Sequence, residues 1–181
     1  MMELFSKTRE NKFTLVFLQN KNYLEELHKI VNSRKKDNAK ICYVCLSKPY
    51  AEIIEDFKNE KIDCNNFFFV DTLSSLSYNL QPVKNCIFVS KPDNLNGIKK
   101  AIKKAIAKHG CGTVVFDTIS TLLIYQQAHS IVRFTHEMIM DEMQKTVDKV
   151  YLVLKEAGIY RDESAKLIKD LHLFADKIVE L

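Results

Sequence analysis

The sequence predicts one α/β domain, in which helices cover both faces of a doubly wound, mostly parallel β-sheet. Short apolar runs of strand length alternate with amphipathic stretches of helix length along the chain. The apolar runs are continuous, which is typical of strands that are buried on both faces. The length of 181 residues fits a single domain, and no linker or internal repeat divides residues 1–181.

The expected strands are rich in β-branched and aromatic residues. They cover residues 13–18, 41–46, 67–70, 86–89, 113–116, 150–154 and 177–181. The expected helices carry apolar residues with a period of about 3.6. They cover residues 22–34, 49–59, 91–108, 118–125, 130–146 and 162–174. The polar segment 72–84 is expected to form a loop.

The composition favours a cytoplasmic protein. No stretch approaches the roughly 18 uncharged apolar residues that span a bilayer, so we expect no membrane association. The five cysteines are an odd number and lie mostly in or beside apolar runs, as buried free thiols do in reducing compartments. The net charge of +4 is smaller than the excess usual in a dedicated nucleic-acid-binding domain. Nucleic acid is therefore not the favoured partner.

The most informative strand end is Asp117, which directly follows the apolar run 113–116. Ligands of open parallel sheets bind beyond the carboxyl ends of the strands, so this residue is a candidate for function. A carboxylate here fits two roles. It positions magnesium through water at the end of a Walker B strand, or it caps the helix that follows. The local sequence favours the cap.

Residues 114–122 resemble the Walker B region of KaiC-like ATPases, a branch of the RecA superfamily that is common in archaea. Residues 41–46 resemble the second strand of that family, residues 67–71 its third strand and residues 174–181 its closing strand. The resemblance implies a RecA-like sheet, a tendency to self-associate or to pair with relatives, and an ancestral nucleotide pocket. Lys21, Ser47, Asp71 and Asp117 would line that pocket, and of these only Asp117 matches a functional position of the family.

The chain departs from the family at the phosphate-binding loop. A P-loop needs the pattern G-x-x-x-x-G-K-[ST], whose glycines allow backbone amides to wrap the phosphates. This chain does not contain the pattern, and no serine or threonine stands beside Lys21 to bind magnesium. In active relatives acidic residues follow the second strand, whereas Ser47, Lys48 and Pro49 stand here. A degenerate, non-catalytic member therefore fits the sequence better than an active ATPase.

The predicted helix 91–108 carries a concentration of lysines, opposite its apolar residues. They are Lys99, Lys100, Lys103, Lys104 and Lys108. Such a face is either the solvated outside of a packed helix or a basic patch that binds phosphate groups. No aromatic residues lie between the lysines to stack on bases, which favours the solvated face.

The sequence favours no metal site. Cys42 and Cys45 match C-x-x-C, but residues i and i+3 of a strand point to opposite faces, so the two thiols do not share a metal or readily close a disulfide. His136 and Glu137 begin the pattern H-E-x-x-H, but Met140 stands in place of the second histidine.

Three hypotheses follow for the function. The leading one is a pseudo-ATPase module without a cofactor, which binds a partner protein or copies of itself in a regulatory or sensory role. The second is a weak ATPase that uses ATP and magnesium through Lys21 and Asp117. The third is a nucleic-acid accessory protein that binds through the lysine helix.

Overall fold

The computed structural model describes residues 13–18, 23–34, 40–76, 80–141, 143, 145–154 and 161–181. Seven strands form one sheet in this part of the chain. They are β1 (Phe13–Leu18), β2 (Lys40–Cys45), β3 (Phe67–Asp71), β4 (Cys86–Phe88), β5 (Cys111–Asp117), β6 (Asp148–Leu154) and β7 (Lys177–Glu180). The α-helices are α1 (Tyr23–Arg34), α2 (Tyr50–Asn59), α3 (Leu95–His109), α4 (Ala128–Met140) and α5 (Arg161–His172). Short 3₁₀ segments are η3 (Cys64–Asn66), η4 (Ser74–Leu76) and η5 (Ile119–Ile124).

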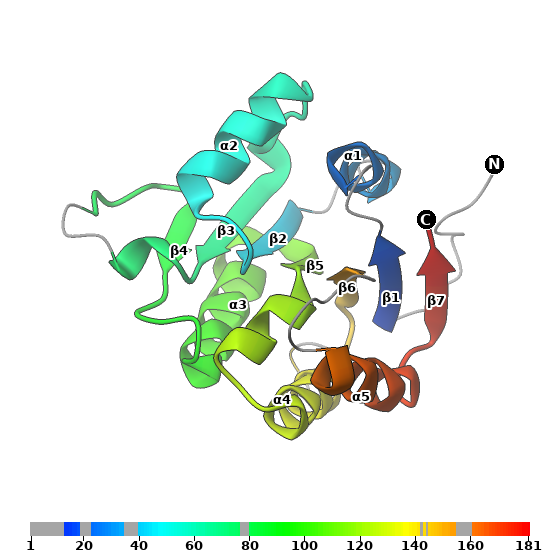
Figure 1. The fold of residues 1–181 in the computed structure, drawn as a ribbon. Helices are drawn as coiled ribbons and strands as arrows, with labels where there is room; N and C mark the ends of the chain where they lie inside the picture. The colour runs from blue at the N-terminus through cyan, green and yellow to red at the C-terminus, as the bar shows by residue number, and fades with distance from the viewer. Residues whose placement is uncertain are drawn as a thin grey trace.

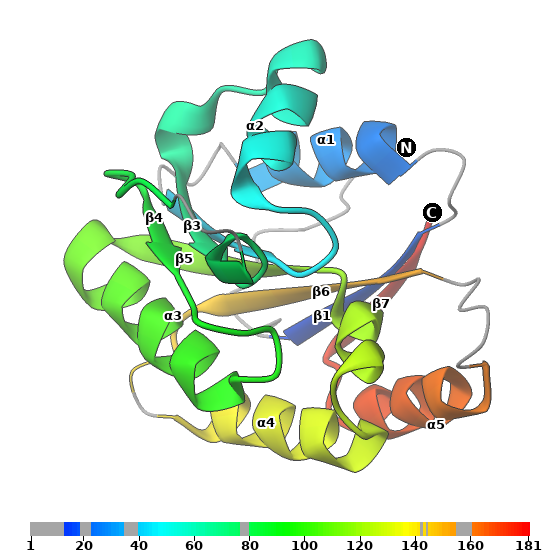
Figure 2. The ribbon, with the colours of Figure 1, turned by 60° about the vertical axis from the view of Figure 1, so that its left-hand side comes forward.

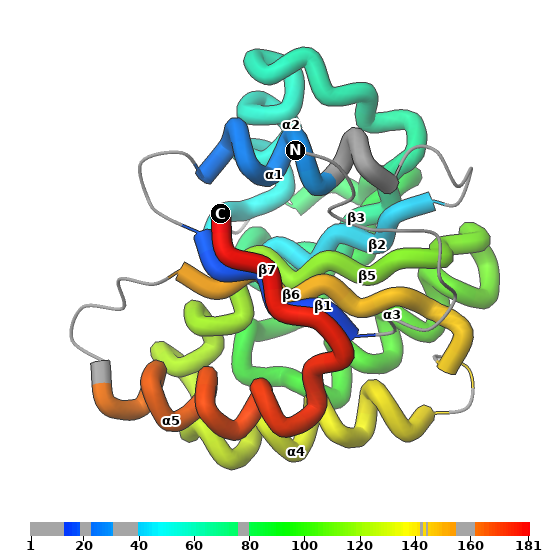
Figure 3. Tube along the Cα trace, turned by 90° about the vertical axis from the view of Figure 1, so that its right-hand side faces the viewer, coloured from blue at the N-terminus to red at the C-terminus, as the bar shows by residue number. Residues whose placement is uncertain are grey.

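The sheet is doubly wound, as the sequence predicts. Its strand order is β4-β3-β2-β5-β6-β1-β7, and every pair of neighbours is parallel. The chain runs from β1 through β2 and β3 to one edge, and then returns through β5 and β6 to β7 at the other. Right-handed crossovers therefore place α1 and α2 on one face and α3, α4 and α5 on the other (Figures 1 and 2). The side view in Figure 3 shows the sheet between these two helix layers.

Each face of the sheet has its own hydrophobic core. Under α1 and α2, aromatic rings of β2, β3 and α2 pack edge to face, with Phe57 at 5.5 Å from Tyr43 and 5.0 Å from Phe67 between ring centroids. Under α3, α4 and α5, the other core includes Phe116 and Tyr151, whose centroids are 4.5 Å apart. Strands buried on both sides are the reason for the continuous apolar runs in the sequence.

The two cysteines of the C-x-x-C pattern lie on opposite faces of β2, as predicted. Cys42 belongs to the core under α3 and Cys45 to the core under α1 and α2. Both are free and fully buried, and burial raises the pKa of each thiol well above its ordinary value. Neither is a reactive thiolate at neutral pH.

Local hydrogen bonds set the ends of α3. Asn94 caps its start by accepting a hydrogen bond from the Gly97 amide at 2.8 Å, so the helix begins at Leu95 rather than near residue 91. Gly110 ends it with a φ of 69°, in the left-handed region that favours glycine.

The predicted helices 118–125 and 130–146 differ from the structure. The first is the 3₁₀ segment η5, and the second, α4, ends at Met140. The backbone of Asp141 is extended, with φ of −69° and ψ of 123°, and its carboxylate lies 2.6 Å from the Lys103 ammonium of α3. This contact with another helix is a tertiary one, which local periodicity does not contain.

Candidate functional site

The carboxyl ends of β2 and β5 form a topological switch point of the sheet. The two strands are neighbours, but β2 leads to α2 on one face and β5 leads through η5 to α4 on the other. Open α/β sheets bind ligands at such points. Here the chain after β2 is tied to β5, because the Leu46 and Ser47 amides donate to the Asp117 carbonyl at 2.9 and 3.0 Å.

Asp117 lies at this point with its carboxyl group inside the protein. It is fully buried, and the Tyr43 hydroxyl donates a hydrogen bond to Oδ2. The other oxygen, Oδ1, has no hydrogen-bond partner among the described residues. Burial raises the pKa of Asp117 from 3.8 to about 8. At pH 7 most molecules therefore carry Asp117 as the neutral acid.

The favoured sequence interpretation of Asp117, a helix cap, is wrong. Thr118 is the N-cap residue of η5, and no side-chain hydrogen bond caps this segment. The peptide bond between Asp117 and Thr118 is cis. The side-chain partner of Asp117 is instead Tyr43, on the neighbouring strand. This pairing depends on the order of strands in the sheet, so local sequence does not contain it.

Asp71 has a structural role at the end of β3. Its Oδ1 accepts hydrogen bonds from the backbone amides of Leu73 at 2.7 Å and Ser74 at 3.0 Å. Its Oδ2 accepts from the Tyr50 amide at 2.8 Å and from the Ser74 hydroxyl. The carboxylate thus joins the start of α2 to the turn after β3. Both oxygens are occupied by the protein itself.

The other two residues of the predicted pocket are Ser47 and Lys21. Ser47 is exposed, and the neighbouring Lys48 forms an ion pair of 2.6 Å with Asp56 of α2. Lys21 lies outside the described residues. The structure thus places Ser47, Asp71 and Asp117 at the carboxyl ends of three neighbouring strands, but it directs the two carboxyl groups to protein partners.

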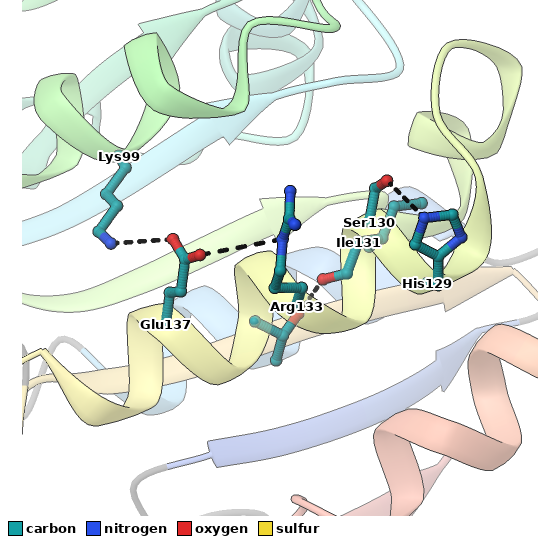
Figure 4. Close-up of polar contacts among 7 residues, drawn as sticks. Lys99, His129, Ser130, Ile131, Arg133 and Glu137 are labelled. Atoms are coloured by element: carbon teal, nitrogen blue, oxygen red, sulfur yellow. Dashed lines mark hydrogen bonds and ion pairs between the residues drawn. The ribbon is translucent and has the colours of Figure 1, made fainter.

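The lysine helix α3 has two different rows of lysines. Lys99 lies 3.1 Å from Glu137 and Lys103 lies 2.6 Å from Asp141, so this row is paired with α4. Figure 4 shows the contact of Lys99 with Glu137. The other row, one residue further at each step, is Lys100, Lys104 and Lys108. These three are exposed and form no ion pair in the part of the chain that the structure describes.

A groove between the edge strand β4 and helix α3 lies beside the unpaired lysines. Its volume is about 330 Å³, and its lining includes the apolar residues Ile87, Val89 and Ala101 together with Lys100 and Lys104. We call it the β4–α3 groove. Sequence reasoning missed it, because the edge position of β4 follows only from the strand order. The offset of one residue between Lys100 and Lys104 on one hand and Lys99 and Lys103 on the other was a usable signal, since it turns the two rows about 100° apart around the helix.

A second, polar cavity of about 220 Å³ lies between the start of α3 and helix α4. The Gln126 side chain donates to the Asp93 carbonyl at 2.9 Å, and Glu137 lies between Lys99 and Arg133, whose Nε is 4.0 Å away (Figure 4). These contacts link the two helices across the cavity.

The described residues contain no group of three or more histidine, cysteine, aspartate or glutamate side chains that could hold a metal ion. His136 and Glu137, which begin the incomplete zinc pattern, point to other partners. The His136 ring contacts Phe174, and Glu137 pairs with Lys99. No helix within the described ranges is long and apolar enough to cross a membrane.

No family model matches the chain, and no curated protein matches its sequence. Solved structures match its fold. The KaiC-like protein PH0186 from the hyperthermophilic archaeon Pyrococcus horikoshii OT3 is 11% identical and has a TM-score of 0.61, over 94% of this chain and 72% of that one. The uncharacterized protein PH0321 from Pyrococcus horikoshii, solved in complex with an unknown peptide, is 13% identical and has a TM-score of 0.68, over 94% of this chain and 77% of that one. The chain therefore has an α/β fold of the KaiC/RecA-like type.

Proposed function

We propose that this chain is a non-catalytic, pseudo-ATPase module of KaiC-like fold, which acts by binding another protein in a regulatory or sensory role. The state of Asp117 carries the proposal. A Walker B acid acts as an anion that holds magnesium through water. Asp117 is instead buried against Tyr43, with its pKa raised to about 8 by that burial. It supplies little negative charge at neutral pH.

Other groups around the switch point support the same proposal. The Asp71 carboxylate accepts three backbone hydrogen bonds, and Lys48 is paired with Asp56. The sequence has only four glycines, and none precedes Lys21 in the arrangement that a P-loop requires. Asp71 and Lys48 are thus engaged by protein partners, and the glycines of a P-loop are missing from the sequence.

Binding of a protein fits the surface beside the edge strand β4. The β4–α3 groove has apolar lining residues together with two exposed lysines, as an interface has an apolar centre and a polar rim. The structure of PH0321, which shares the fold, holds an unknown peptide. By this likeness we infer that peptide segments are the class of ligand for this chain as well.

Thermal unfolding with and without millimolar ATP, ADP and magnesium tests the proposal. A ligand at 100 times its dissociation constant adds about 2.7 kcal/mol to the free energy of unfolding, which is readily seen as a rise in Tm. We expect no rise. The matched variant Asp117→Asn keeps the shape of the side chain and removes its ability to ionise.

A nucleotide-dependent rise in Tm that Asp117→Asn removes would overturn the proposal. Magnesium-dependent ATP hydrolysis that is lost in both Asp117→Asn and Lys21→Ala would assign the chain to the weak ATPases instead. Both measurements use the whole protein and do not depend on knowing its partner.

A further inference from the structure

We propose that the β4–α3 groove binds an extended, acidic segment of a partner protein, which joins the sheet as a new strand beside β4. The inference rests on the proposed function and names the kind of partner that the module recognises. Three features carry it: the backbone edge of β4 that no described strand covers, the apolar lining of the groove, and the row of lysines on α3 that form no ion pair with a described residue.

The backbone of β4 presents hydrogen-bonding groups away from the sheet. The described sheet ends at β4, which pairs with β3 alone. The Phe69 amide donates to the Asn85 carbonyl and the Val89 amide donates to the Asp71 carbonyl, each at 2.8 Å, so residues 85 and 89 face β3. Strand residues alternate in direction, and the amide and carbonyl of Phe88 therefore point outward. An extended peptide can pair with them as a further strand.

The groove provides a place for an apolar side chain of such a peptide. It holds about 330 Å³ and lies against Ile87 and Val89 of the β4 segment and Ala101 of α3. A strand with only three residues offers few main-chain hydrogen bonds. Burial of an apolar side chain in the groove supplies the additional binding free energy that the short edge does not.

The lysine row determines the charge of the partner. Lys100 and Lys104 line the groove, and Lys108 continues the row by one helical turn. The pKa of the neighbouring His109 is lowered by burial and then by the positive charges of Lys40, Lys104 and Lys108. The surroundings of His109 are therefore positively charged. Since the other lysine row is neutralised by α4, the unpaired row gives this side of α3 its excess charge. Acidic side chains complement it.

These features favour a foreign protein segment over the other occupants. An apolar lining and an outward-facing strand backbone offer little to a phosphate backbone, so nucleic acid is not favoured. The strand β7 forms the opposite edge of the described sheet, and its four residues include one lysine and one glutamate. A second copy that docked by this strand would bring no excess of negative charge.

Selection from a displayed library of random octapeptides tests the inference on the whole protein. We expect the selected peptides to be rich in aspartate and glutamate around one apolar residue. Their dissociation constants are then measured by fluorescence anisotropy for the double variant Lys100→Glu with Lys104→Glu. Binding should weaken at least about tenfold, because the variant repels acidic side chains.

A matched control changes the same charge elsewhere. Lys166→Glu with Lys169→Glu reverses two exposed lysines of α5 and should leave peptide binding unchanged. Unchanged circular dichroism and Tm establish that both double variants are folded. Backbone methylation of the selected peptide gives a test without any protein variant. Methyl groups on one set of alternate amides should abolish binding, and methyl groups on the other set should not, because only one set faces β4.

Several outcomes would overturn the inference: no enrichment, enrichment of peptides without acidic residues, equal binding by both double variants, or binding that tolerates both methylation patterns. Tighter binding of a short single-stranded oligonucleotide at the same lysines would assign the groove to nucleic acid. Self-association that Lys100→Glu with Lys104→Glu abolishes would assign it to a second copy. A nucleotide-dependent Tm would overturn the proposed function without affecting the peptide result, so the two failures are distinguishable.

Discussion

Asp117 has the position of a functional acid and the surroundings of a core residue. It ends the central strand β5, where the sequence resembles a Walker B strand, but its carboxyl group faces the core under α1 and α2. Side chains of a strand point to alternate faces, and Val115, two residues before Asp117, belongs to the same core. Sequence predicts the strand and its last residue. It does not predict the partner, because Tyr43 is far away in the chain.

The substitution Asp117→Asn should stabilise the protein increasingly as the pH rises. The unfolded chain loses the Asp117 proton near pH 3.8, whereas the folded protein keeps it until about pH 8. Between these values the unfolded state binds fewer protons, so the contribution of Asp117 to stability falls with rising pH and is lost above pH 8. Asparagine does not ionise and can still accept the Tyr43 hydrogen bond.

Urea denaturation of the wild type and Asp117→Asn, at several pH values from about 4 to about 9, measures this difference. The free energy of unfolding of the variant relative to the wild type should rise by a few kcal/mol across the range, since one pKa unit corresponds to about 1.4 kcal/mol. Other titrating groups cancel in the comparison. Parallel curves for the two proteins would contradict the buried, neutral carboxyl group.

The polar side of helix α3 carries two rows of lysines with different surroundings. The row of Lys99 and Lys103 holds α4 by ion pairs, whereas the row of Lys100, Lys104 and Lys108 faces solvent beside the groove. The sequence places all five on the side away from the apolar residues, and the structure confirms this. What divides them is the position of α4, whose Glu137 and Asp141 come from a distant segment.

Replacement of Lys103 by alanine should lower stability more than replacement of Lys100. Lys103 lies 2.6 Å from Asp141, a carboxylate whose side chain is only 12% exposed. Although burial opposes it, the hydrogen bond and charge of Lys103 hold the pKa of Asp141 below its ordinary value. We expect a loss of up to about 1 kcal/mol for Lys103→Ala and a change within about 0.5 kcal/mol for Lys100→Ala.

Chemical denaturation of the two single variants measures both values. A double-mutant cycle with Asp141→Ala isolates the ion pair, since Lys103→Ala should cost nothing once Asp141 is absent. Equal losses for Lys100→Ala and Lys103→Ala would contradict the division of α3 into two rows.

The molecule as a whole is two hydrophobic cores that share one sheet. The period of the apolar residues predicted the elements and the doubly wound parallel arrangement, because both follow from local patterns. Strand order does not follow from them. It places β4 at an edge and β2 beside β5, and thereby determines both the groove and the Tyr43–Asp117 pair. The groove and the Tyr43–Asp117 pair were not predicted, because the sequence alone does not determine the strand order.

A cavity in one core should lower stability on both faces. Phe57 is fully buried in the aromatic cluster under α2, and Phe57→Ala is expected to cost about 3–5 kcal/mol. Because the strands of the shared sheet belong to both cores, the loss should appear in amide hydrogen exchange of α2 and of α5 on the opposite face. Unchanged protection of Leu171 in α5 would show that the two cores unfold independently.

The position of β1 has a consequence for how the protein is made. Of the seven described strands, β1 leaves the ribosome first, and its neighbours β6 and β7 leave last. All six of its residues are buried in the finished protein, among them Phe13 and Phe17. A nascent chain therefore exposes this apolar segment until nearly all of the fold has been translated, so we expect β1 to be a segment through which newly made chains aggregate.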